Sequence, residues 1–101
     1  MWNVISAAEF HQYQKEGRPM VVIDMRNPED YERGHVPDAV NLPGNSWMNY
    51  RDALPRDRLL VFYCYHGGNS MQAARQFSKI GYQAVSVYGG TMFLSRNGED
   101  F

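Results

Sequence analysis

Two unbroken apolar runs, residues 20–23 and 59–63, constrain the fold of this chain more than any other feature. Short runs that are apolar at every position are typical of strands buried on both faces of a parallel sheet. The first strand is expected to extend over residues 20–25. Weaker patterns predict two more strands, over residues 39–42 and 84–88.

Helix signals stand between these strands. A capping-box pattern at residues 6–9 predicts a helix that continues to about residue 15. An N-cap residue followed by proline predicts a helix over residues 28–33, and a further short helix is expected over residues 47–54. From Ser70 onward, apolar side chains recur at helical spacing, at Met71, Ala74, Phe77 and Ile80, which predicts another helix. Gly81 follows where a C-terminal cap is expected.

The alternation of strands and helices predicts an α/β fold with three layers. Because crossovers between parallel strands carry helices, we expect a mainly parallel central sheet with helices on both faces. The chain has 101 residues, the size of one domain, so we expect a single domain over residues 1–101.

The ten lysines and arginines are balanced by eleven aspartates and glutamates, for a net charge of −1. This balance argues against recruitment to nucleic acid or to an anionic membrane by bulk charge, so we expect neither as a partner. The longest apolar runs fall far short of the roughly 20 residues that a membrane span needs. The first residues lack the pattern of a secretory signal, and we therefore expect a cytoplasmic protein.

Cys64 is the only cysteine, so it is a core thiol, an intermolecular bridge or a reactive nucleophile. It directly follows the apolar run at 59–63 and precedes the predicted helix. A loop in this position gathers backbone N–H groups and the positive end of the helix dipole, which stabilise a thiolate. Gly67 and Gly68 allow such a loop to wrap around a sulfur atom. We interpret Cys64 as a nucleophile; the alternative is that the glycines only make a tight turn.

Two separate motifs stand out along the chain. The first comprises Asp24, Met25, Arg26, Glu29, Tyr31, Gly34, His35, Val36, Pro37, Ala39 and Asn41. The second begins at Cys64 and continues with Ser70, Ala73, Ala74, Gly81, Tyr82, Val85, Gly89 and Gly90. Together they resemble the rhodanese homology domain. The resemblance covers roughly residues 4–94 and is strongest to single-domain thiosulfate sulfurtransferases whose loop begins Cys-Tyr-His-Gly.

This resemblance implies a thiosulfate sulfurtransferase of the rhodanese type, which works by double displacement. Cys64 would take a sulfane sulfur from thiosulfate or a persulfide donor and pass it to cyanide, a small thiol or a thioredoxin-like protein. The residues expected to bind the small anionic donor follow the nucleophile directly: Tyr65, His66, Gly67, Gly68, Asn69 and Ser70. Their backbone N–H groups would stabilise the charged sulfur. The resemblance implies no metal and no organic cofactor.

Asn69 departs from the family pattern, because many active members carry arginine or lysine five residues after the cysteine. An amide hydrogen-bonds to sulfite oxygens but contributes no charge. The alternative function is therefore a non-catalytic regulatory module, or a sulfur relay that receives persulfide from a protein partner. Phosphatases and arsenate reductases of this fold have a loop one residue longer that ends in arginine, and this chain has neither feature.

Asp24 and Arg26 end the first long strand on the same side of the sheet as Cys64. We expect them to form a buried ion pair that organises the neighbouring loops. His35 is expected to be a structural hydrogen-bonding side chain. Cys64, His66 and His35 lack the paired spacing of zinc ligands, so we expect no metal site.

Overall fold

The computed structural model describes residues 2–44, 46–65 and 67–90. In these ranges, five strands form one parallel sheet in the order β1-β5-β4-β2-β3. The strands are β1 (Trp2–Ile5), β2 (Met20–Asp24), β3 (Val40–Asn41), β4 (Leu59–Tyr63) and β5 (Ala84–Val87). The helices are α1 (Ala7–Lys15), α2 (Pro28–Arg33), the 3₁₀ helix η1 (Ser46–Tyr50) and α3 (Gly68–Lys79). The predicted α/β class is confirmed.

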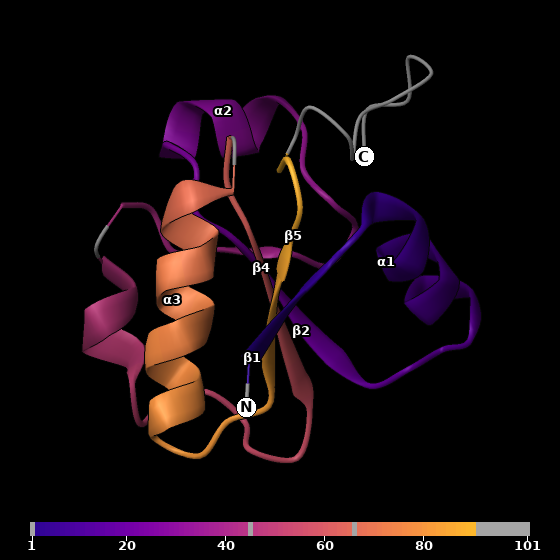
Figure 1. The fold of residues 1–101 in the computed structure, drawn as a ribbon. Coiled ribbons are helices and arrows are strands. Elements are labelled where there is room, and N and C mark those ends of the chain that lie inside the picture. The colour runs from indigo at the N-terminus through magenta and orange to yellow at the C-terminus, as the bar shows by residue number, and fades with distance from the viewer. Residues whose placement is uncertain (1, 45, 66, 91–101) are drawn as a thin grey trace.

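β4 lies at the centre of the sheet, and all five of its residues are buried. Its side chains alternate between two cores. Leu60 and Phe62 belong to the cluster that includes residues of α3 and η1, whereas Val61 and Tyr63 belong to the cluster that includes α1. Figure 1 shows α3 on one side of the sheet and α1 on the other. A central parallel strand needs apolar side chains on both faces, which explains the unbroken run in the sequence.

The first two helices lie close to their predicted ranges. The Ser6 hydroxyl accepts the Glu9 N–H at 3.0 Å, and the Glu9 carboxylate accepts the Ser6 N–H at 3.1 Å, which is the predicted capping box of α1. α2 begins at Pro28 as expected, although the Asn27 side chain makes no cap hydrogen bond. Neither these helices nor any other in the described ranges is long and apolar enough to span a membrane.

Three elements differ from the prediction. β1, which pairs with β5 at the edge of the sheet, was not predicted, because four residues of mixed polarity carry no clear period. The strand expected over 39–42 is reduced to Val40–Asn41. The helix expected over 47–54 is a 3₁₀ helix that ends at Tyr50; helices of this type are short because their hydrogen-bond geometry is poor.

The face of α3 that packs on the sheet agrees in part with the predicted apolar spacing. Ala74 and Phe77 are fully buried, whereas Met71 and Ile80 are 41% and 38% exposed. The buried residues of α3 are Ser70, Ala73, Ala74 and Phe77. These side chains are mostly small, so the helix can approach the sheet closely and fill the space between them without voids. The two larger flanking side chains are left at the rim.

Candidate active site

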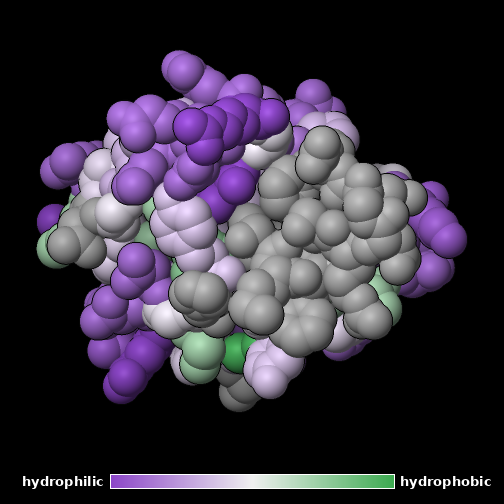
Figure 2. Space-filling view, turned by 90° about the horizontal axis from the view of Figure 1, so that it is seen from above, coloured by the Kyte–Doolittle hydropathy of each residue, from purple (hydrophilic) through white to green (hydrophobic). Residues whose placement is uncertain are grey.

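The carboxyl ends of the strands meet at the top of Figure 1, where α2 and the loop after β4 lie. Ligands of parallel sheets flanked by helices bind at this edge. Cys64 directly follows β4 here and is 4% exposed. Figure 2 looks onto this end of the molecule, and hydrophilic side chains cover much of the part drawn in colour. The predicted nucleophile therefore lies at the edge where this type of fold binds ligands.

The turn that begins α3 holds the Cys64 sulfur. The Gly67 N–H donates to Sγ at 3.0 Å, and the thiol donates to Ser70 Oγ at 3.5 Å. Gly67 is the N-cap of α3 with φ of +101°, a left-handed conformation that glycine adopts without strain. Of the six loop amides expected to face the sulfur, that of Gly67 therefore contacts it. Contacts from the other five stay a prediction.

The turn after β5 approaches the same loop at its backbone. Gly90 has φ of +56°, and a Cβ atom built there would lie 2.0 Å from the Cys64 carbonyl oxygen and 2.7 Å from that of Tyr65. No side chain larger than hydrogen fits at this distance. The backbone conformation at Cys64 therefore depends on a glycine that lies far away in the sequence.

Ser86 is a site residue that sequence reasoning missed. Its hydroxyl is fully buried in β5 and lies 2.7 Å from Ser70 Oγ, which also donates to the Gly67 carbonyl at 3.1 Å. Ser70 has one hydroxyl proton, so when it donates to Gly67 it must accept the proton of Ser86. With Ser86 as the donor, the Ser70 proton is free to turn to a Cys64 thiolate. A polar residue within a small, apolar strand was the available signal.

Asp24, the last residue of β2, forms the expected ion pair with Arg26. Arg26 Nη2 lies 2.8 Å from Asp24 Oδ2, and their side chains are 9% and 0% exposed. Burial lowers the pKa of the Arg26 guanidinium, but the hydrogen bonds and charge of Asp24 outweigh it, so this pKa lies above its ordinary value. Burial, together with a 2.6 Å hydrogen bond to Asp24, raises the pKa of Tyr63. Arg26 is therefore charged at neutral pH, and Tyr63 is a hydrogen-bond donor.

This buried network holds the segment between α2 and β3. Arg26 Nη2 donates to the Gly34 carbonyl at 2.5 Å, and the Val36 N–H donates to the Tyr63 hydroxyl at 3.2 Å. The ion pair thus connects the end of β2 to a neighbouring loop, which is the arrangement that its sequence position suggested.

α2 contacts two of the predicted site residues. Tyr65 follows Cys64 directly in the chain. Its hydroxyl donates to the Asp30 carboxylate and accepts the Asn27 N–H at 3.2 Å. The hydrogen bond to Asp30 raises the pKa of Tyr65. His35 stacks on Tyr31 with 3.9 Å between ring centroids, and its Nδ1 lies 2.9 Å from the Tyr31 carbonyl oxygen. α2 therefore links the active-site loop to the segment that carries His35.

The other residues predicted to bind the donor have no hydrogen bond to the Cys64 sulfur in the described ranges. Gly68 and Asn69 are exposed in the first turn of α3, beside the buried Ser70. His66 lies outside the described residues. Among the residues that the structure describes, no three His, Cys, Asp or Glu side chains gather as metal ligands would. Within the described ranges, the Cys64 sulfur thus has hydrogen bonds to one backbone amide, that of Gly67, and to one hydroxyl, that of Ser70.

The model of the rhodanese-like domain matches residues 6–93 of this chain. The chain belongs to the rhodanese-like domain family. A solved structure of a rhodanese-like domain protein from Staphylococcus aureus has a TM-score of 0.84 at 22% identity, and the match covers 95% of this chain and 94% of that one. The resemblance inferred from the two motifs is confirmed, and so is the rhodanese-like fold.

Three proteins similar to this chain are named sulfurtransferases. A sulfurtransferase from Allochromatium vinosum is 29% identical over 99 residues, which are 97% of this chain and 92% of that protein. The thiosulfate sulfurtransferase GlpE from Pseudomonas syringae is 38% identical over 71 residues, 69% of this chain and 67% of that one. A tRNA sulfurtransferase from Pyrobaculum aerophilum is 39% identical over 67 residues; the match takes in 66% of this chain but spans only 14% of that longer protein.

Proposed function

We propose that this chain is a thiosulfate sulfurtransferase in which Cys64 carries the sulfur as a persulfide. The observation that carries the proposal is the hydrogen bond from the Gly67 N–H to the Cys64 sulfur at the start of α3. An amide at the positive end of a helix dipole stabilises a thiolate and, after transfer, a persulfide anion. Sulfurtransferase relatives with the same family domain support this assignment.

The first half-reaction loads the enzyme. The Cys64 thiolate attacks the outer sulfur of thiosulfate, and a new sulfur–sulfur bond forms as the bond of thiosulfate breaks. The electron pair of the broken bond leaves with sulfite, which departs as a dianion, and the transferred sulfur keeps its negative charge as the terminal atom of the persulfide. The amides at the start of α3 would stabilise that charge as an oxyanion hole does. Asn69, exposed in the same turn, would hydrogen-bond to the sulfite oxygens.

The second half-reaction returns the enzyme to its starting state. A thiolate or cyanide attacks the terminal sulfur of the Cys64 persulfide, and the bond between the two sulfurs breaks. The electron pair returns to Cys64, whose thiolate is again held by Gly67 and Ser70. No net oxidation occurs, because the sulfane sulfur moves from one nucleophile to another.

Incubation with thiosulfate, followed by intact-mass measurement, tests the donor. We expect a gain of one sulfur atom that is removed by cyanide or a small thiol, since both would attack the persulfide. Iodoacetamide treatment before thiosulfate should prevent the gain, because it blocks the thiolate. A protein whose Cys64 is alkylated readily but gains no sulfur from thiosulfate would contradict the proposed donor and favour a sulfur relay fed by a partner.

Replacing Asn69 with arginine is expected to lower the KM for thiosulfate several-fold. A hydrogen bond with a charged partner contributes about 1.5–3 kcal/mol against about 1 kcal/mol for a neutral one, so the added guanidinium should improve binding of the sulfite end. Transfer from the persulfide to the acceptor should change little, because sulfite has left by then. Steady-state kinetics with each substrate varied in turn measures both effects, and an unchanged or higher thiosulfate KM in a folded variant would show that residue 69 does not contact the donor.

A further inference from the structure

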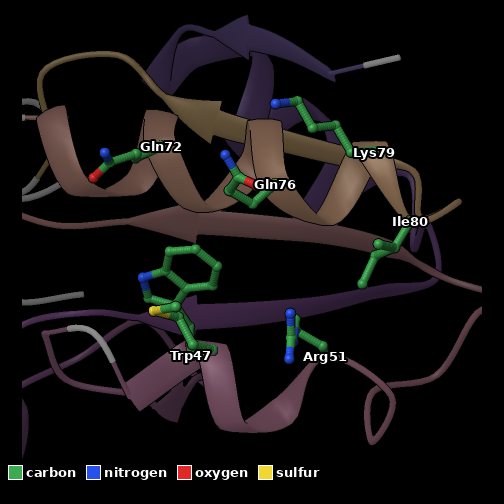
Figure 3. Close-up of a pocket in the computed structure, with 7 residues that line it drawn as sticks. Trp47, Arg51, Gln72, Gln76, Lys79 and Ile80 are labelled. Carbon is green, nitrogen blue, oxygen red and sulfur yellow. The ribbon is translucent and has the colours of Figure 1, made fainter.

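A groove of about 570 Å³ runs between η1 and α3. Figure 3 shows Trp47 extending from η1 toward α3, with Arg51, which directly follows η1, beside the same groove. The α3 side of the groove is lined by Gln72, Gln76, Lys79 and Ile80. Trp47 is only 7% exposed and packs on Phe77 with 5.8 Å between ring centroids. The groove therefore has a rigid aromatic base and side walls of mixed chemistry.

The charged side chains of this groove are all basic. Arg51 and Lys79 line it, and its lining contains no acidic residue. In the part of the chain that the structure describes, neither cation forms an ion pair, whereas nearby Arg56 pairs with Asp52 at 3.8 Å. α3 itself contains no acidic residue, although the whole chain has a net charge of −1. A local excess of unpaired cations favours an anionic occupant.

The other lining side chains suit a peptide segment. Met48 is 50% exposed and Ile80 is 38% exposed beside the buried Trp47, so an apolar side chain could be covered from both sides. Methionine and tryptophan are enriched in protein interfaces, where methionine adapts to the partner's shape. Gln72 and Gln76 lie one helical turn apart and offer both donors and acceptors to a peptide backbone.

The groove begins close to the nucleophile. Gln72 lies four residues after Gly68, or about 6 Å further along the helix axis. Trp47 belongs to the same buried cluster as Cys64. A partner bound in the groove would therefore reach the active-site loop with the residues next to the bound segment.

We propose that the groove between η1 and α3 docks an acidic segment with apolar side chains, belonging to the protein that exchanges sulfur with Cys64. The exchange of sulfur rests on the function proposed above, whereas the binding itself does not. Two groove cations in a chain of net charge −1 are too few for a nucleic-acid track, and a free inorganic anion would leave the apolar walls unused.

Fluorescence of Trp47 in a Trp2→Phe background tests the proposal, because these are the two tryptophans of the chain. The probes are two capped heptapeptides, one alternating glutamate with leucine and one alternating lysine with leucine. We expect saturable binding of the acidic peptide, weakened at least about tenfold between low salt and about 0.5 M salt, and no binding of the basic one. Arg51→Glu with Lys79→Glu should weaken binding at least about tenfold. The matched double reversal, Lys15→Glu with Arg18→Glu at α1, should not.

Equal binding of both peptides, or unchanged binding to the groove variant, would overturn the proposal. Glutarate serves as a small dicarboxylate probe; saturation of the fluorescence change by glutarate at the peptide's affinity would overturn the assignment to a protein segment. Sulfur loading from thiosulfate is measured on the same samples. Normal sulfur loading without peptide binding would refute only the proposed docking in the groove. Peptide binding without sulfur loading of the wild type would refute the thiosulfate reaction but not the docking.

Discussion

Replacing Cys64 with serine is expected to reduce sulfur transfer at least about 10³-fold while the fold stays intact. The substitution removes the atom that would form the persulfide, and a hydroxyl is far less nucleophilic than a thiol at neutral pH. The fold should persist because a serine hydroxyl is slightly smaller than the thiol and meets the same partners, the Gly67 N–H and the Ser70 hydroxyl. Transfer rates with thiosulfate and an acceptor thiol, together with thermal unfolding, measure the two effects.

Intact mass gives the control for this substitution. The serine variant should gain no sulfur under the conditions that load the wild type, because the chain has no other cysteine. A folded variant that retained activity within tenfold of the wild type would show that sulfur transfer does not pass through Cys64.

The central strands could be predicted from the sequence because a strand covered on both faces favours apolar residues at every position. β2 and β4 pair along their whole length, and the buried β4 is apolar throughout. The capping box of α1 could be predicted for a similar reason, since it depends on two residues three positions apart, Ser6 and Glu9. β1 could not, because its position depends on pairing with β5 from the other end of the sequence, with Trp2 opposite Ala84. Non-local pairing of a short edge strand leaves no local pattern.

The same distinction applies to the candidate site. The residues from Cys64 to Ser70 are one continuous segment, so a thiol followed by a glycine-containing loop could be recognised from the sequence. Ser86 takes part through a hydroxyl contact with Ser70 across the interface of α3 and β5, which no spacing rule indicates. The hydrogen bond between Tyr65 and Asp30 likewise joins segments 35 residues apart. Local motifs indicate Cys64 as the candidate nucleophile, but the groups that hold its loop come from tertiary packing.

The phase of α3 gives a further reason for partial success. Of the four residues with apolar spacing, Ala74 and Phe77 are buried, but Met71 and Ile80 are partly exposed. Ser70 is also buried, because its hydroxyl is satisfied by Ser86 and Gly67. A polar residue with hydrogen-bond partners can take a core position, and a pattern based on hydrophobicity does not identify it.

Replacing Gly90 with alanine is expected to deform the active-site loop and to lower the free energy of unfolding by about 3 kcal/mol or more. Gly44→Ala is the matched control. The two glycines have nearly the same φ, +56° at Gly90 and +57° at Gly44, but a Cβ atom at Gly44 meets no described atom within 4 Å apart from those of its two chain neighbours. In the control, the free energy of unfolding should therefore fall only by the strain of an alanine in the left-handed conformation, about 1–2 kcal/mol. The difference between the variants isolates the contact with the Cys64 carbonyl.

Activity should separate the two variants more clearly than stability. In Gly90→Ala, the added methyl group can be accommodated only if the Cys64 and Tyr65 carbonyls move, because the built Cβ atom lies 2.0 Å and 2.7 Å from their oxygens. Such a shift would displace the sulfur from the Gly67 amide, so we expect at least about a tenfold loss of sulfur transfer in the folded fraction. Gly44→Ala should retain nearly full activity. Equal stability and equal activity of the two variants would mean that the turn after β5 does not position the nucleophile. Denaturant unfolding and transfer rates at a temperature where both variants are folded decide between these outcomes.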